Sequence, residues 1–228
     1  QVIFPYSEDE LEALKPDILL TIGQNIVSKK IKKFLREHQP TQHWHLDEYW
    51  QPDTFQALTD KIQTKPELFL EQFVPFVNSK EADYYTKWNT IRKANEIKHK
   101  KYVNMMPFCD LKVVDSIVKN YPENWQVQYG NSTVIRYGLL FDHQPNNPIF
   151  CNRGTSGIDG STSTAIGACL ASGQNTVMIT GDISFFYDSN ALWNVNMPNN
   201  FRIILINNGG GNIFKFISGP SETDVVEE

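Results

Sequence analysis

The stretch GDISFFYDSNALWNVNMPNNFRIILINN, residues 181–208, decides the fold class of this 228-residue chain. An apolar run that ends at Thr180 leads into Gly181-Asp182, and a second run, 201–206, leads into Asn207-Asn208. Only a helix-length connection separates the two runs, which is the spacing of parallel strands joined by a crossover. Two such strands, lying side by side, would form one polar edge where their carboxyl ends meet.

Composition limits the classes of function. Hydrophobic residues make up 40% and charged residues 21% of the chain, which is ordinary for a globular protein. A net charge of −5 argues against a general binder of nucleic acid or anionic membranes, and no apolar run is long enough to span a bilayer. Cys109, Cys151 and Cys169 are too few and too scattered for a disulfide framework, so we expect a reducing, cytoplasmic setting. The chain starts without Met and stops after a glycine-rich loop, and we expect it to be a piece of a longer protein.

Apolar strands alternate with helical segments along the whole chain. The first part predicts a strand at 17–23, a helix at 27–38, a strand at 43–47, a short helix at 54–61 and a connector at 65–80. Two helices follow, a long one at 83–102 and one at 111–120 with Asp110 as its N-cap. Further strands are expected at 125–129, 149–151, 176–180 and 201–206, with helices between them at 133–140, 161–171 and 189–195. This alternation predicts an α/β fold, in which open parallel sheets carry helices on both faces.

Several other motifs compete as the functional feature of this fold. Gly23-Gln24-Asn25 follows a strand but lacks the full G-x-G-x-x-G pattern, so we interpret it as a plain turn. NRGTSGIDGST, residues 152–162, has the glycine content of a phosphate loop but not the lysine of a P-loop. His43 and His45 share a strand face and could bind metal, although a partly buried pair is favoured because no cysteine or third histidine is near. Asp182 and Asp188 resemble the acidic motif of haloacid-dehalogenase-like phosphatases, whose upstream D-x-D nucleophile is missing.

The polar edge itself offers hard oxygen ligands. Asp182 supplies a carboxylate, Asn208 an amide oxygen and Gly210 a backbone carbonyl. Such a set suits Mg²⁺, which prefers octahedral oxygen coordination completed by phosphates and water. Backbone N–H groups around Ile183, Ser184 and Gly210 are expected to cradle those phosphates. The sequence therefore predicts a diphosphate–Mg²⁺ clamp.

The order of these motifs resembles a known group of enzymes. GD, one helix, one strand and then NN resembles the metal motif of thiamine-diphosphate enzymes. Within that superfamily, four segments resemble the 2-succinyl-5-enolpyruvyl-6-hydroxy-3-cyclohexene-1-carboxylate synthases of menaquinone biosynthesis: YGNSTVIR (129–136), NRGTSGIDGSTSTAIGA (152–168), GDISFFYDSNAL (181–192) and INNGGGNIF (206–214). The resemblance is strong over 127–216 and weaker over 17–47.

The resemblance also implies a domain organisation. Residues 1–80 would be the C-terminal part of a Rossmann-like central domain with a connector, and residues 81–228 a diphosphate-binding domain truncated at its C-terminus. The family's N-terminal pyrimidine-binding domain, with its cofactor-protonating glutamate, would be absent. Because the family's active site forms between these domains across a dimer, we expect a full-length homodimer or homotetramer and an inactive fragment.

Family chemistry gives each candidate residue an expected role. The family is a transferase and carboligase that decarboxylates 2-oxoglutarate with thiamine diphosphate and adds the succinyl unit to isochorismate. The resemblance assigns Mg²⁺ or Mn²⁺ to Asp182, Asn208 and the carbonyl of Gly210. It makes Ile158 the apolar wedge that bends the cofactor.

Other residues would contact the substrates or complete the cofactor site. Ser132, Arg136 and Arg153 would face the substrates, whose carboxylates suit the bidentate guanidinium; Arg136, on a helix, has the stronger chance of facing solvent. The remaining predicted cofactor contacts are Gly181, Ile183, Ser184 and Ile213. Ile213 and Phe214 would either line the apolar part of the pocket or pack on the core.

Two alternatives stay open. Another thiamine-diphosphate enzyme, such as an acetolactate-synthase-like carboligase or a 2-oxo acid decarboxylase, has the same metal motif. Two arginines placed for a dicarboxylate argue against it. Residues 1–80 taken alone also fit a non-catalytic Rossmann-like interaction module, since they show no site chemistry.

Overall fold

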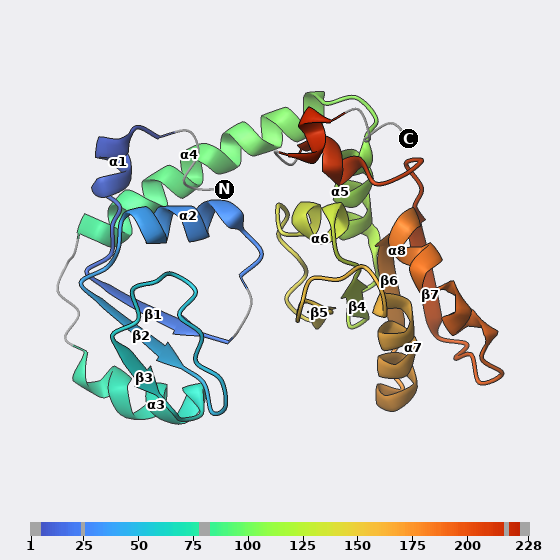
Figure 1. Cartoon of the computed structure of the whole chain (residues 1–228), viewed down its shortest axis with the longest axis horizontal. Coiled ribbons are helices and arrows are strands. Elements are labelled where there is room, and N and C mark those ends of the chain that lie inside the picture. Colours follow the sequence, from blue (N-terminus) through green and yellow to red (C-terminus); the bar gives the residue numbers. More distant parts are fainter. Residues whose placement is uncertain (1–5, 24–25, 78–82, 217–218, 224–228) are drawn as a thin grey trace. The chain divides into compact units, whose positions relative to one another are not determined.

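The chain divides into two compact units, residues 1–104 and 105–228, and each unit contains its own parallel sheet (Figure 1). The computed structural model describes residues 6–23, 26–77, 83–216 and 219–223. Strands and helices alternate as predicted, and the expected α/β class is confirmed. The division between the units follows the long helix, whereas the expected boundary after residue 80 precedes it; the domain assignment stays a prediction. None of the helices in the described part combines the length and apolar character that a membrane crossing requires.

The first unit is built on three parallel strands in the order β1-β2-β3. The strands are β1 (Ile18–Ile22), β2 (Gln42–Leu46) and β3 (Asp60–Ile62). The helices are α1 (Glu8–Glu12), α2 (Lys29–Glu37), α3 (Pro66–Phe73) with a 3₁₀ turn at Val74–Phe76, and α4 (Asp83–Met105). Leu19 of β1 packs with α2 and α4, whereas Trp44 of β2 meets Phe73 of α3 edge to face, so helices cover both faces.

Two expectations for this unit are wrong. Residues 54–61 form a turn that runs into β3, because Asp60–Ile62 pairs in parallel with Trp44–Leu46. The expected connector contains helix α3, which begins at Pro66; proline fits the first turn of a helix, where its missing N–H has no helical partner. Residues 78–80 of that connector lie outside the described residues.

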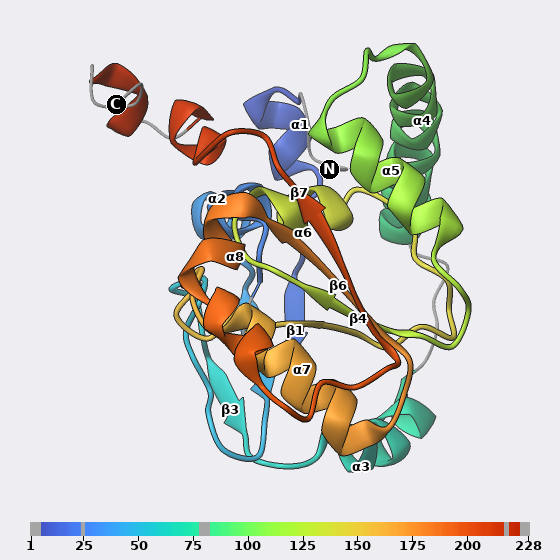
Figure 2. The ribbon, with the colours of Figure 1, turned by 90° about the vertical axis from the view of Figure 1, so that its right-hand side faces the viewer.

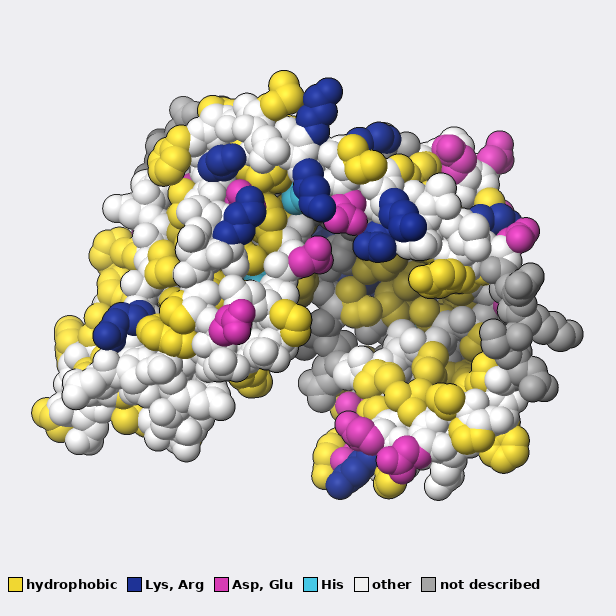
Figure 3. Space-filling view, turned by 180° about the vertical axis from the view of Figure 1, so that it is seen from behind, with side chains coloured by type: hydrophobic (Ala, Val, Ile, Leu, Met, Phe, Trp, Pro, Cys, Tyr) yellow, Lys and Arg dark blue, Asp and Glu magenta, His cyan; other side chains and the backbone are white. Residues whose placement is uncertain are grey.

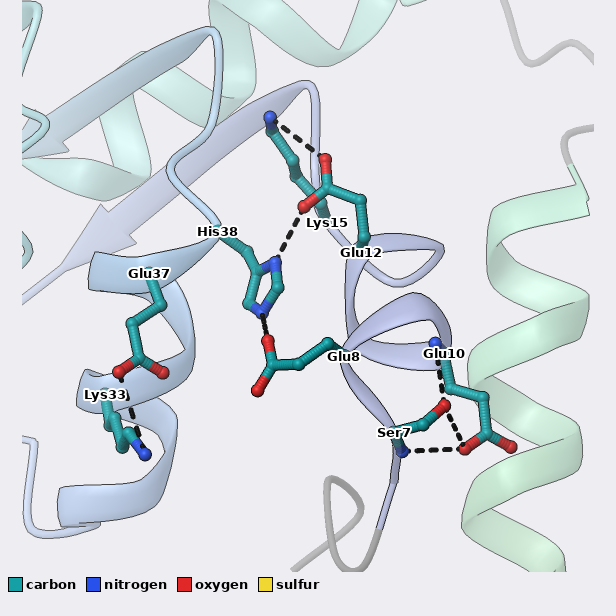
Figure 4. A network of polar contacts seen from close by, with 8 residues as sticks. All are labelled: Ser7, Glu8, Glu10, Glu12, Lys15, Lys33, Glu37 and His38. Atoms are coloured by element: carbon teal, nitrogen blue, oxygen red, sulfur yellow. Dashed lines mark hydrogen bonds and ion pairs between the residues drawn. The ribbon is translucent and has the colours of Figure 1, made fainter.

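A buried histidine connects α1 with the end of α2 (Figure 4). His38 is 7% exposed; its Nδ1 lies 2.7 Å from Glu12 Oε2 and its Nε2 lies 3.4 Å from Glu8 Oε2. The hydrogen bond with His38 is the main cause that lowers the pKa of Glu12. Because α1 has only five residues, it depends on these contacts and on the capping box between Ser7 and Glu10.

Thr21 holds the two strand histidines of the first unit. Its Oγ1 lies 2.9 Å from His43 Nε2 and 2.7 Å from His45 Nδ1, and both rings are buried. Burial is the main cause that lowers the pKa of His43. Among the described residues, no three His, Cys, Asp or Glu side chains cluster as a metal site would require. Both histidines are buried on their strand, as the favoured interpretation expects.

The second unit contains four parallel strands in the order β5-β4-β6-β7. They are β4 (Gln126–Tyr129), β5 (Ile149–Cys151), β6 (Thr176–Gly181) and β7 (Phe201–Ile206). The helices are α5 (Asp110–Asn120), α6 (Thr133–Gly138), α7 (Ser161–Ser172) and α8 (Asp182–Tyr187), with 3₁₀ turns at Ser189–Trp193, Asn212–Phe216 and Pro220–Glu222. Gly181 pairs with Ile206, so the ends of β6 and β7 lie side by side as predicted.

Helices cover both faces of this sheet as well. Met178 of β6 is buried in a cluster with Ala165, Ile166 and Cys169 of α7, which lies in front of the sheet in Figure 2. Tyr129 of β4 has its ring against α6, where it approaches Gly138.

Two elements of the second unit differ from expectation. Asp110 is the first residue of α5, and the N-cap is Cys109. Residues 182–187 form helix α8, whose first turn contains the favourably placed carboxylate of Asp182, and the helix expected at 189–195 is the short 3₁₀ turn Ser189–Trp193. Exposed aromatic residues in α8 hide the helical periodicity from the sequence pattern.

Close packing of α6 on β4 depends on Gly138. A methyl group there would lie 2.9 Å from two ring carbons of Tyr129, whose side chain is buried. We predict that Gly138→Ala destabilises the fold by about 1–3 kcal/mol, because the enclosed ring has no room to retreat.

Gly167→Ala is the matched control for this prediction. Gly167 lies inside α7, where an added methyl group meets nothing within 4 Å, so alanine should stabilise the helix by up to about 1 kcal/mol. Denaturant unfolding of both variants measures the difference. Equal stability of the two variants would contradict the packing argument.

Candidate functional site

A cavity of about 240 Å³ lies in the second unit, beyond the carboxyl ends of β4, β6 and β7. Every residue of the predicted thiamine-diphosphate, metal and substrate site lines it: Ser132, Arg136, Arg153, Ile158, Gly181, Asp182, Ile183, Ser184, Asn208, Gly210 and Ile213. Phe214 lines it too, and its side chain is about half exposed. The fold therefore brings these residues together, while their individual roles stay predictions.

Asp182 fastens the loop after β7 to the end of β6. Its Oδ2 accepts the N–H groups of Gly209 and Gly210, each at 3.0 Å, and its Oδ1 accepts the N–H of Ile183 at 2.8 Å. Its side chain is buried. Gly209 and Gly210 have φ of +79° and +137°, a region that favours glycine, which explains the glycine run at this point.

These bonds change the expected phosphate cradle. Ile183 and Gly210 were two of the three N–H donors predicted to face phosphate, and both donate to Asp182 instead. A nearby carboxylate is a strong acceptor for backbone N–H groups, so it occupies them first. The carboxylate still has lone pairs beyond these three bonds.

Asn208 presents an amide oxygen without a partner. Its Nδ2 donates to Asp110 Oδ2 at 2.6 Å, and its Oδ1 is buried with no hydrogen bond within the described residues. A buried acceptor left unpaired costs free energy, so it indicates a group from outside the chain. A cation that accepts oxygen ligands fits this atom and the adjacent carboxylate of Asp182.

A hydrogen bond holds the SGIDG turn, residues 156–160, against α8. Ser184 Oγ donates to the carbonyl of Ile158 at 2.6 Å, and Ser184 is buried. Ile158 is half-buried at the cavity wall. The two residues thus connect a loop and a helix that are separate in the sequence.

Asn131 is a site residue that the sequence analysis missed. It follows β4 and is 1% exposed; its Nδ2 donates to the carbonyls of Asn152 and Gly157, and its Oδ1 accepts from an Nη of Arg153 at 3.0 Å. One amide therefore fixes the SGIDG turn and the guanidinium of Arg153 together. Its place between Gly130 and Ser132, directly after a strand, is the signal that could have found it.

Two arginines bring positive charge to the cavity. Burial, and after it the charge of Arg153, lowers the pKa of Arg136. The Nε atoms of both arginines are buried without a hydrogen-bond partner among the described residues. Two like charges held together at a cavity favour an anion there. Arg136 thus lines the cavity from α6, although its helical position had suggested solvent.

Two residues at the cavity wall have strained backbone conformations. Ser132 has φ +74° and ψ −134°, and Ser156 has φ +65°, values that residues with side chains rarely adopt. Ser132 is the N-cap of α6, but its hydroxyl makes no cap hydrogen bond. Such strain is typical of residues held in place for binding or catalysis.

Comparisons with known proteins relate the chain to a named group of enzymes, although no family model matches it. It is 49% identical over 223 residues to the 2-succinyl-5-enolpyruvyl-6-hydroxy-3-cyclohexene-1-carboxylate synthase of Flavobacterium psychrophilum. It is 46% identical over 224 residues to the protein of that name from Flavobacterium johnsoniae, and 37% identical over 223 residues to that from Bacteroides thetaiotaomicron.

These alignments cover 98%, 98% and 95% of the chain but only 40%, 40% and 38% of the three relatives. The chain thus spans about two-fifths of the length of the curated relatives that it matches. Over nearly all of its residues, the chain is therefore related to one segment of the 2-succinyl-5-enolpyruvyl-6-hydroxy-3-cyclohexene-1-carboxylate synthases, as its motifs indicate.

Proposed function

We propose that the chain is a segment of a thiamine-diphosphate-dependent synthase that decarboxylates 2-oxoglutarate and adds the succinyl unit to isochorismate. The observation that carries this proposal is the convergence of two features on one cavity. One is the pair of oxygen ligands on Asp182 and Asn208, and the other is the pair of charges on Arg136 and Arg153. In this proposal, residues 1–80 end a central domain and residues 81–228 belong to the diphosphate-binding domain.

The residues at the strand ends fit a divalent cation, Mg²⁺ or Mn²⁺. Asp182 and the unpaired Oδ1 of Asn208 would hold it with the carbonyl of Gly210. That carbonyl accepts one N–H, from Asn212 at 2.8 Å, and keeps a second lone pair. One carboxylate with two neutral oxygens leaves charge on the cation for the diphosphate.

The cavity wall fits the organic part of the cofactor. When bound, thiamine diphosphate supplies the nucleophilic carbon and the electron sink for decarboxylation of a 2-oxo acid. Ile158, whose carbonyl is held by Ser184, would be the apolar contact that sets the cofactor's bent shape. Ile213 and Phe214 add apolar surface to the same cavity.

The arginines fit substrates that carry carboxylates. Arg153 is oriented by Asn131, and its unpaired Nε leaves donor capacity for a carboxylate. Arg136 adds a second charge. The hydroxyl of Ser132, which makes no capping bond to α6, offers a further hydrogen bond. A substrate with two carboxylates, such as 2-oxoglutarate, would balance the repulsion between the two guanidinium groups.

Substrate choice separates this function from its alternative, a pyruvate-using carboligase or decarboxylase with the same metal motif. The paired arginines and the printed names of the relatives favour the dicarboxylate. The test is turnover by the whole protein that carries this chain, with 2-oxoglutarate and isochorismate as substrates and pyruvate as the control. Preference for pyruvate would overturn the assignment.

We further propose that the whole protein is a cytoplasmic homodimer or homotetramer with a site shared between subunits. All three cysteines are unpaired, as in a reducing compartment. Phe186, Tyr187, Trp193 and Val195 are 66–96% exposed, and Figure 3 shows hydrophobic patches on one face of the molecule. Extended apolar surface of this kind commonly marks contacts with another chain. Sedimentation equilibrium measures the assembly, and an active monomer would contradict it.

The first functional prediction concerns the cation. Asp182→Ala should abolish metal-dependent binding of thiamine diphosphate, because it removes the only formal charge among the proposed ligands. Asn208→Ala should weaken binding less, since an amide oxygen is a weaker ligand. Both losses should exceed those at Asn207→Ala, an exposed neighbour outside the cavity. Calorimetric titration with and without EDTA measures them, and unchanged affinity in Asp182→Ala would remove the clamp.

The second functional prediction separates the arginines. Arg153→Met keeps much of the side-chain volume and removes one charge-assisted contact, which typically contributes about 1.5–3 kcal/mol. We expect kcat/KM to fall roughly ten- to a hundredfold while cofactor binding persists. Arg136→Met should cause a smaller or more substrate-selective loss, because no described residue anchors Arg136 as Asn131 anchors Arg153.

Arg202→Met is the matched control, since Arg202 is exposed on β7 and, within the described part of the chain, bonds only to nearby backbone carbonyls. Its kinetics should match those of the unmodified protein. Steady-state kinetics in which each substrate is varied separately decides between the arginines. Intact specificity constants in Arg153→Met would show that this arginine has a structural role.

A further inference from the structure

Asp110 reaches the cation side of the cavity from a distant part of the sequence. It is the first residue of α5 and lies 98 positions before Asn208, yet both residues line the same cavity. Its Oδ2 accepts a hydrogen bond from Asn208 Nδ2 at 2.6 Å. Neither the strand-end pattern nor the predicted clamp includes this carboxylate.

The chemistry of the two groups fixes which way the amide faces. An asparagine side chain can present either its oxygen or its NH₂ group, and rotation about one bond exchanges them. An ionised carboxylate has no hydrogen to donate, so only the NH₂ group can face Asp110. The amide oxygen must therefore face away from Asp110, and it is the buried atom that has no partner among the residues that the structure describes.

We propose that Asp110 is a positioning residue that holds the Asn208 amide with its oxygen toward the cation of the cavity. The inference rests on the proposed function, because the cation belongs to it. The charge-assisted bond also draws electron density toward Oδ1, which makes this oxygen a better ligand. Asp110 itself lies on the nitrogen side of the amide, so it acts through Asn208.

The hydrogen bond further explains why the unpaired oxygen is tolerated. Without Asp110, Asn208 could turn its NH₂ group into the cavity, where it would repel a cation. Amide orientation therefore decides whether the loop after β7 favours or disfavours metal. Asp110 removes the unfavourable orientation before any ligand arrives, and this preorganisation raises affinity.

The test is metal affinity in the whole protein that carries this chain. Asp110→Asn keeps the shape of the side chain but lets its own amide meet Asn208 with either group, so the orientation of Asn208 is no longer fixed. We expect Mn²⁺ and Mg²⁺ affinity in the presence of thiamine diphosphate to fall about ten- to a hundredfold, as with other partners of metal ligands. Calorimetry, or the electron paramagnetic resonance of free Mn²⁺, measures this without turnover.

Asp142→Asn is the matched control, because it removes the same charge from an exposed position of the second unit outside the cavity. A positioning role also predicts that excess metal restores kcat in Asp110→Asn, whereas a merely structural role would lower kcat at every metal concentration. Thermal melting of the metal-free proteins should show similar stability for Asp110→Asn and Asp142→Asn.

The outcomes separate this inference from the proposed function. If Asp182→Ala loses metal binding and Asp110→Asn matches Asp142→Asn, Asp110 has no positioning role and the proposed cation site stands. If Asp110→Asn lowers kcat but leaves metal affinity intact, the inference is likewise overturned. If Asp182→Ala and Asn208→Ala also bind metal normally, both the cation site and this inference fail.

Discussion

The carboxylate of Asp182 is the contact on which the rest of the site depends. Parallel pairing brings Gly181 opposite Ile206, but strand pairing alone does not fix the conformation of the loop after β7. Hydrogen bonds that the N–H groups of Gly209 and Gly210 donate to Asp182 fix that conformation and keep Asn208 at the cavity. One buried carboxylate thus shapes the backbone and remains available as a ligand, because its oxygens have more lone pairs than these bonds use.

A second group of contacts holds positive charge at the cavity. The amide of Asn131 binds two carbonyls around the SGIDG turn and accepts from Arg153, so the turn and the guanidinium are fixed as one piece. Arg136 approaches closely enough for the charge of Arg153 to help lower its pKa. Holding two guanidinium groups together costs electrostatic free energy, and a bound carboxylate or phosphate recovers it. The carboxylate of Asp182 and the guanidinium groups of Arg136 and Arg153 therefore place opposite charges at one cavity.

Two glycines let the elements around the cavity approach each other closely. A methyl group on Gly130 would lie 2.8 Å from Thr180 Oγ1, and one on Gly138 would meet the ring of Tyr129. The ends of β4 and β6 and the helix α6 are consequently nearer to each other than larger residues would permit. Ser132, between these glycines in the sequence, has a φ of +74°.

The sequence predicts the parallel α/β class, nearly all strands, the polar edge after β6 and β7, and the family resemblance, because apolar periodicity and strand-end residues are local signals. It misjudged residues 54–61 and 65–77, where pairing with β2 and a proline-initiated helix prevailed over local propensity. Three contacts are visible only in the folded chain: Asp110 meets Asn208, Asn131 anchors Arg153, and two N–H groups that were expected to face phosphate donate to Asp182. A hydrogen bond between residues up to 98 positions apart depends on how strands and helices pack in space, and no local sequence pattern predicts that packing.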